Sequence, residues 1–210
     1  MICPRKPPIA ALLAPSYRTR AQAGAKIQTA VRVNTRVTPQ EFRGLDLPED
    51  RQWELHEGEI VEMTSPTWIH RALQDRIADR LKAILPRNRY RVLVEMPFEP
   101  GNNERSADVG VVSIGREQGA SISGVLLGAP EMVVEVWSKS NPKPELAAYK
   151  KLCFDHGTLL FWLIEPDERS VTVSLRDEPS TVTFERDDLI PLDPLVDSRL
   201  PVSEIFEGIV

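Results

Sequence analysis

The chain has 210 residues and a formal net charge of −5, with 41% hydrophobic and 27% charged residues. These values are typical of a soluble globular protein, and no apolar run approaches the roughly 20 residues that a membrane-spanning helix needs. The two cysteines, Cys3 and Cys153, lack metal-ligand spacing, which favours a reducing compartment. The sequence therefore predicts a cytoplasmic protein that does not enter a membrane.

The charge is distributed unevenly along the chain. Residues 1–36 hold seven basic residues, four prolines and no acidic residue, which leaves 19 basic against 31 acidic residues in the remainder. We expect residues 1–36 to be a disordered, basic, proline-containing tail, with a transit peptide as the alternative. Residues 37–210 are expected to form a single domain. Because this domain is acidic, contact with DNA would need a local basic face.

The first predicted helix begins at Pro39. Thr38 suits the N-cap, proline suits the first helical position, and Glu41 completes a capping box. Residues 53–55 and 59–63 are predicted strands, and Gly58 between them favours a turn. The domain is therefore predicted to start with a helix followed by a hairpin.

The longest predicted helix follows Ser65-Pro66-Thr67 and ends at Pro86. Its apolar residues recur at helical spacing and form one stripe, which we expect to face the core. The stripe contains Ile69, Leu73, Ile77, Leu81 and Ile84 or Leu85.

The rest of the chain alternates between predicted strands and helices. Strands are expected at 90–98, 108–113, 132–137 and 159–164, with a glycine- and serine-rich loop between the second and third. A helix at 144–155, a terminal hairpin of 171–175 with 181–184, and a helical turn at 202–206 are also expected. This order predicts an α/β fold of the α+β, mixed-sheet kind.

Two predicted strands each contain a carboxylate where a core residue is expected. Asp108 lies in the run Ala107–Val112, and Glu135 lies in the run Glu131–Val136. An ionised carboxylate inside a packed sheet is costly unless it is paired, hydrogen-bonded or bound to a metal. On neighbouring strands, the two would suit Mg²⁺ or Mn²⁺ together with a carbonyl and waters. The alternative is that both lie at strand ends, solvated or paired with arginine.

Several short motifs occur in a specific order and spacing from about Thr38 to the C-terminus. They are Thr38–Phe42, Trp53–Glu59, Pro66 with His70, Ala107–Val109, Val133–Ser138, Gly157 and Phe161–Pro166. Together they resemble the Uma2 family of restriction endonucleases, a branch of the PD-(D/E)xK nuclease superfamily. The resemblance implies a restriction-endonuclease-like core with flanking helices and an N-terminal hairpin.

The resemblance also implies functional residues. Asp108 matches the family's metal-binding aspartate, Glu135 its second carboxylate, and Glu59 an accessory metal ligand. His70 matches a histidine near the start of the long helix. From the residues alone, Glu59 is more simply an exposed strand residue, and His70 a residue that forms hydrogen bonds at the helix start.

The lysine of the superfamily is absent from its usual positions. Trp137 stands two residues after Glu135, and Tyr149 stands fourteen residues after it, where the family commonly has lysine. Lys150 adjoins Tyr149, although a shift of one residue turns a side chain by about 100° around a helix. We predict that Lys150 neutralises the phosphate or orients water. The alternative is a solvated lysine on an amphipathic helix.

The local basic face is predicted on the long helix. We expect Arg71, Arg76 and Arg80 to contact phosphates of nucleic acid, with salt-dependent and weakly selective binding. The neighbouring basic residues are Lys82, Arg87, Arg89 and Arg91. The alternative is the ordinary charged face of a solvated helix, in which Arg71 pairs with Asp75.

Together these features predict a Mg²⁺- or Mn²⁺-dependent endonuclease that hydrolyses phosphodiester bonds in DNA. The alternative is a nuclease fold that has lost catalysis and serves as a binding or oligomerisation module. Tyr149, Trp137 and the acidic domain favour that alternative. DNA is the expected partner if the protein is active, a homodimer is left open, and no membrane partner is expected.

Overall fold

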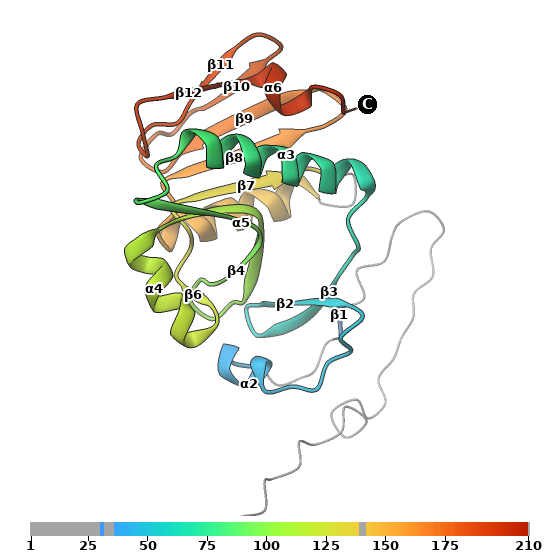
Figure 1. The fold of residues 1–210 in the computed structure, drawn as a ribbon. Coiled ribbons are helices and arrows are strands. Elements are labelled where there is room, and N and C mark those ends of the chain that lie inside the picture. Colours follow the sequence, from blue (N-terminus) through green and yellow to red (C-terminus); the bar gives the residue numbers. More distant parts are fainter. Residues whose placement is uncertain (1–29, 32–35, 139–141, 210) are drawn as a thin grey trace, which may run out of the picture. The chain divides into compact units, whose positions relative to one another are not determined.

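The computed structural model describes residues 30–31, 36–138 and 142–209 (Figure 1). These residues group into two compact units. The first contains the described residues up to Ser65 together with Asn102–Arg105, and the second contains Pro66–Gly101 and those from Ser106 onward. Most of the predicted tail lies outside the described residues, and within its range Ala30–Val31 form strand β1. Among the described helices, none has the length and apolar character needed to cross a membrane.

In the first unit, β1 is followed by helix α2, which spans Pro39–Arg43. The predicted capping box is present. The backbone N–H of Glu41 donates to Thr38 Oγ1 at 3.3 Å, and the backbone N–H of Thr38 donates to the Glu41 carboxylate at 2.9 Å. This backbone donation from Thr38 stabilises the charged carboxylate, so the pKa of Glu41 lies below its ordinary value.

The predicted hairpin follows α2. Strands β2 (Gln52–His56) and β3 (Glu59–Met63) pair antiparallel, and β1 pairs with the other edge of β3. Gly58 takes a φ of +84° in the turn between β2 and β3, a conformation in which side chains are strained. The small core of this unit contains Phe42, Leu55 and Ile60.

The second unit is built on a seven-stranded mixed sheet with the order β10-β9-β8-β7-β5-β4-β6. Strands β7 and β8 run parallel, whereas β5 pairs antiparallel with β7, and β9 pairs antiparallel with both β8 and β10. The strands of this sheet are β4 (Tyr90–Glu99), β5 (Arg105–Ser113), β6 (Leu126–Leu127), β7 (Met132–Val136), β8 (Leu160–Glu165), β9 (Ser170–Leu175) and β10 (Thr181–Glu185). A separate antiparallel pair comprises β11 (Leu189–Pro191) and β12 (Arg199–Pro201).

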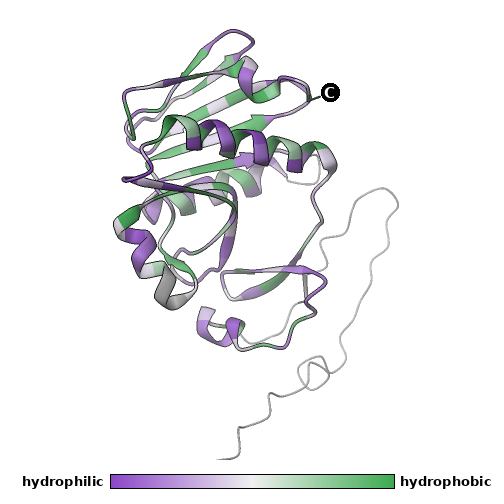
Figure 2. Cartoon of the chain, in the orientation of Figure 1, coloured by the Kyte–Doolittle hydropathy of each residue, from purple (hydrophilic) through white to green (hydrophobic). Residues whose placement is uncertain are grey.

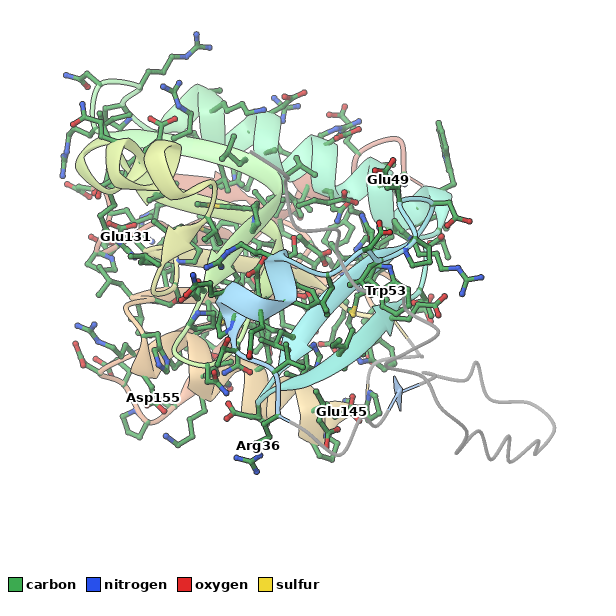
Figure 3. All side chains as sticks on the ribbon, turned by 90° about the horizontal axis from the view of Figure 1, so that it is seen from below. Arg36, Glu49, Trp53, Glu131, Glu145 and Asp155 are labelled. Atoms are coloured by element: carbon green, nitrogen blue, oxygen red, sulfur yellow. The ribbon has the colours of Figure 1, made fainter. Side chains whose placement is uncertain are left out.

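Helices cover both faces of the large sheet. They are α3 (Trp68–Ile84), α4 (Ile114–Ser123), α5 (Lys143–Asp155) and α6 (Val202–Phe206). Figures 1 and 3 show α3 over one face and α5 over the other. Because α5 connects the parallel strands β7 and β8, it is a crossover helix and starts at the end of the sheet where β7 ends.

Each face of the sheet has its own core. Leu73 and Ile77 of α3 belong to a large cluster with Val134 of β7. Tyr149 of α5 belongs to a second cluster with Val133 of β7. Neighbouring strand residues therefore enter opposite cores, as the pleat requires. Figure 2 shows the central strands as largely hydrophobic, which fits strands buried on both faces.

The predicted fold class is confirmed, with a mixed sheet, flanking helices and an N-terminal hairpin. The structure also contains strands that the sequence does not predict (β1, β6, β11 and β12), and α4 occupies the segment predicted as a loop. Its two glycines, Gly115 and Gly119, lower helix propensity, which is why the composition favoured a loop. The helix is instead supported by an ion pair from another strand, since Arg91 of β4 contacts Glu117 at 2.8 Å.

The packing of α3 yields a stability prediction. Leu73 is fully buried, whereas Ile69 on the same helix is 39% exposed. We expect Leu73→Ala to lower the free energy of unfolding by about 2–5 kcal/mol, because it removes buried methyl groups and leaves a cavity. Ile69→Ala is the control and should stay within about 0.5 kcal/mol. Chemical denaturation measures both free energies of unfolding. Equal losses in the two variants would contradict the conclusion that Leu73, and not Ile69, lies on the buried face of α3.

Candidate active site

The candidate site lies where strands β5 and β7 separate. Their antiparallel pairing includes Gly110 with Val133 and Val109 with Val134. One step further in the same register, Asp108 of β5 stands opposite Glu135 of β7. The structure therefore brings together the two carboxylates predicted from the sequence.

Each carboxylate accepts a hydrogen bond from the backbone of the opposite strand. The N–H of Val136 donates to Asp108 Oδ2 at 2.7 Å, and the N–H of Asp108 donates to Glu135 Oε1 at 3.4 Å. Side-chain oxygens thus satisfy N–H groups that a regular ladder would pair with carbonyls. This exchange ends the ladder and holds each carboxylate against the backbone of the opposite strand.

Helix α3 supplies two further partners for Asp108. His70 Nε2 lies 2.9 Å from Asp108 Oδ1, and Gln74 Nε2 donates to the same oxygen at 2.8 Å. Residues four apart on a helix share one face, so the two reach the carboxylate together. Thr67 caps the helix by accepting from the His70 backbone N–H at 3.3 Å. The carboxylate is therefore held in one orientation by α3 and β7.

Tyr149, the residue at the family's lysine position, is part of the core. It is only 6% exposed, and its ring centre lies 6.3 Å from that of Phe98 and 6.2 Å from that of Phe161. Its hydroxyl donates to the carbonyl of Ser106 at 3.3 Å, two residues before Asp108. A packed aromatic ring thus occupies the position at which a charged side chain was expected.

Lys150 points toward a different strand. Its Nζ donates to Ser174 Oγ of β9 at 3.1 Å. Strand β8 lies between β9 and β7, and neighbouring strands are about 4.8 Å apart, so β9 is about 10 Å from the strand that carries Glu135. The next lysine, Lys151, pairs with Asp155 at 2.6 Å.

Trp137 stands two residues after Glu135, and a cation lies over its ring. The N–H of Trp137 donates to the carbonyl of Ile164 at 2.8 Å, which continues the β7–β8 ladder. Nζ of Lys143, the first residue of α5, is 5.8 Å from the centre of the Trp137 ring.

The predicted basic face of α3 is partly used for internal contacts. Arg76 Nη1 donates to the carbonyl of Glu207 at 2.7 Å, and Arg80 pairs with Glu204 of α6 at 3.3 Å. Arg71 makes a longer contact of 3.4 Å with Glu95, and 53% of its side chain is exposed. Two of the three arginines therefore hold the C-terminal segment, and phosphate binding by the three stays a prediction.

Glu59 belongs to the first unit, whereas Asp108 and Glu135 belong to the second. It is exposed on β3 and pairs in register with His56. Its part as an accessory metal ligand stays a prediction.

The donor set fits a hard cation held by few protein ligands. Among residues 36–138 and 142–209, no group of three or more His, Cys, Asp or Glu side chains is arranged to hold a metal. Mg²⁺, however, is commonly bound by one or two carboxylates, with waters and substrate phosphates completing its shell. Asp108 and Glu135 provide that pair, so they would suit Mg²⁺ or Mn²⁺.

Comparison with known proteins identifies the family of this chain. Residues 39–203 match the family model of Uma2, described as "Putative restriction endonuclease". The chain belongs to the Uma2 family. It is also similar to the crystal structure of "a putative nuclease belonging to DUF820" from Anabaena variabilis ATCC 29413, with 26% identity and a TM-score of 0.72. That match covers 83% of this chain and 99% of the other. No curated protein matches.

Sequence reasoning had not identified the α3 partners of Asp108 in this Uma2 protein. The sequence favours His70 as a residue of the helix start, and its backbone does take part in the cap. The sequence does not single out Gln74, which is 2% exposed. The available signal was its spacing of four residues from His70, next to the buried stripe of the helix.

The bond from Gln74 yields a second prediction. Gln74→Leu removes one donor to a charged carboxylate, and hydrogen bonds to charged groups contribute about 1.5–3 kcal/mol. We expect the free energy of unfolding to fall by roughly that amount. Asp75→Asn, a change at the exposed neighbouring position, should alter it by less than about 0.5 kcal/mol. Urea denaturation distinguishes the two, and no loss in Gln74→Leu would mean that the bond does not stabilise the fold.

Proposed function

We propose that this Uma2 protein is a metal-dependent endonuclease that hydrolyses phosphodiester bonds in DNA. The observation that carries the proposal is that Asp108 and Glu135 stand opposite each other at the end of the β5–β7 ladder, where each carboxylate accepts a hydrogen bond from the other strand's backbone. Two like charges on neighbouring strands repel each other, and the hydrogen bonds to Asp108 do not cancel that repulsion. A divalent cation between them would balance the charge of both carboxylates.

In this proposal Asp108 and Glu135 hold Mg²⁺ or Mn²⁺. When bound, the cation polarises a phosphate oxygen and lowers the pKa of the attacking water. His70 and Gln74 keep the Asp108 carboxylate in its binding orientation, and such outer partners commonly tune metal affinity. One oxygen site on Asp108 remains for a cation, because a carboxylate offers about four lone-pair positions and three donors are present.

The remaining proposed roles involve basic residues and Glu59. Lys150 is proposed to neutralise the phosphate or orient water, for which it must exchange its bond with Ser174 for one with substrate. Arg71 is the most exposed of the three predicted phosphate-binding arginines, while Arg76 and Arg80 contact the C-terminal segment. Glu59 is proposed as an accessory ligand.

A second candidate is a nuclease fold that has lost catalysis and serves as a binding or oligomerisation module. It is favoured by Tyr149, whose buried ring occupies the family's lysine position, and by the distance of the Lys150 ammonium from β7. The two candidates differ in one property. Both bind the cation, but only the first cuts DNA.

Metal binding is tested by calorimetry with Mn²⁺. We expect Asp108→Ala to weaken the affinity by more than the roughly 10–100-fold that loss of an outer partner costs, because a direct ligand is removed. Asp75→Ala is the matched control, since it removes an exposed carboxylate from α3. Equal affinities in wild type and Asp108→Ala would end the metal proposal.

Catalysis is tested by nicking of supercoiled plasmid in Mg²⁺. Glu135→Gln should reduce the rate by on the order of 10²-fold or more, because transition-state charge loses its compensation. Lys150→Ala should reduce it by about tenfold or more, whereas Lys151→Ala should not change it, since that lysine pairs with Asp155.

The outcomes separate the two candidates. If Glu135→Gln nicked plasmid as fast as the wild type, the activity would come from another site or from a contaminant. A wild type that binds Mn²⁺ at Asp108 but does not nick DNA under any condition would support the module without catalysis.

A further inference from the structure

Trp137 directly follows β7 and lies on the same face of the strand as Glu135. Its N–H donates to the carbonyl of Ile164, so the strand conformation continues to this residue. Alternation then places Val133, Glu135 and Trp137 on one face, and Val133 packs in the cluster beneath α5. Residues two apart on a strand are about 6.6 Å apart. The indole ring is therefore the next side chain along from the candidate metal ligand.

Lys143 is brought to the same end of the sheet by topology. Helix α5 follows β7, so its first residue lies where β7 ends. Figure 3 labels Glu145 and Asp155, which mark the two ends of α5. Lys143 belongs to the Glu145 end, and Lys151 belongs to the Asp155 end. The Lys143 ammonium lies 5.8 Å from the centre of the Trp137 ring, where the electron-rich face attracts a cation.

The charge of Lys143 is not compensated by an acidic side chain in the described part of the chain. The other two lysines of α5 have partners there, because Lys150 donates to Ser174 and Lys151 pairs with Asp155. Lys143 is exposed and rests on an aromatic ring, which leaves its N–H donors directed to solvent. Such an ammonium is available to an external anion.

A strand of DNA is the anion that the proposed function brings to this end of the sheet. Two carboxylates repel phosphates, and the domain as a whole is acidic, so binding needs a cation close to the site. Because Trp137 is two residues from Glu135 on the same side of the strand, a phosphate held by Lys143 would neighbour the phosphate held at the carboxylates.

We propose that Lys143, held on the ring of Trp137, binds a backbone phosphate of DNA that neighbours the phosphate at Asp108 and Glu135. This rests on the proposed function, because it takes DNA as the substrate. Trp137 is the positioning residue in this arrangement, and Lys143 makes the contact. Base edges play no part, so the contact is independent of sequence.

The test is fluorescence anisotropy of a labelled 20-base-pair duplex with the full-length protein in Ca²⁺, at salt concentrations from 50 to 200 mM. Loss of one phosphate contact should weaken binding several-fold and reduce the slope of log affinity against log salt by about 0.9. We expect this for Lys143→Ala and for Trp137→Leu. Trp137→Tyr should retain most of the affinity, because tyrosine also attracts a cation.

Lys151→Ala is the matched control, since it removes the same charge from the other end of α5. An unchanged affinity for Mn²⁺ in Lys143→Ala would show that the fold and the carboxylate pair are intact. If Lys143→Ala bound DNA with the affinity and salt slope of the wild type, this inference would be overturned and the proposed function would stand. If Lys143→Ala weakened binding to poly-glutamate as much as binding to DNA, the lysine would attract any polyanion, and that result would also overturn the inference. A wild type that neither binds nor nicks DNA would overturn both.

Discussion

The hydrogen bonds around the Asp108 carboxylate determine how this end of the sheet is built. A charge between two strands is costly, and here it is offset by donors from His70, Gln74 and the backbone of Val136. Because two donors come from α3 and one from β7, the same oxygen atoms fix the helix against the sheet. The ladder between β5 and β7 ends there, which leaves Glu135 opposite Asp108.

The packing of α5 decides which of its polar residues can approach that point. Tyr149 fills a space between Phe98 and Phe161, and its burial fixes the rotation of the helix. One residue later the side chain has turned by about 100°, which directs Lys150 to Ser174 on β9. A buried aromatic ring therefore stands where the resemblance to the family places a lysine. In the proposed function, catalysis depends on whether another cation takes the role of that lysine.

The positive charge of the second unit is used in two different ways. Arg76 and Arg80 stabilise the C-terminal segment, so α3 offers less free charge than its sequence indicates. Lys143 is bound to no carboxylate of the described chain and lies over Trp137. An acidic protein that binds DNA needs such local exceptions, since its overall field repels the phosphates. The distribution of partners therefore matters more than the number of basic residues.

The sequence determined most helices, most strands and the fold class, because hydrophobic periodicity and capping residues are local signals. Thr38 with Glu41, and the stripe of Leu73 and Ile77, are examples. It also singled out Asp108 and Glu135, since a carboxylate in an apolar strand is unusual at any position. Only the tertiary structure placed Gln74 and His70 on Asp108, turned Lys150 toward β9 and made α4 a helix. These outcomes depend on strand order, helix rotation and contacts between distant residues. A local pattern, such as the spacing of His70 and Gln74, shows that two residues share a face but not what that face meets.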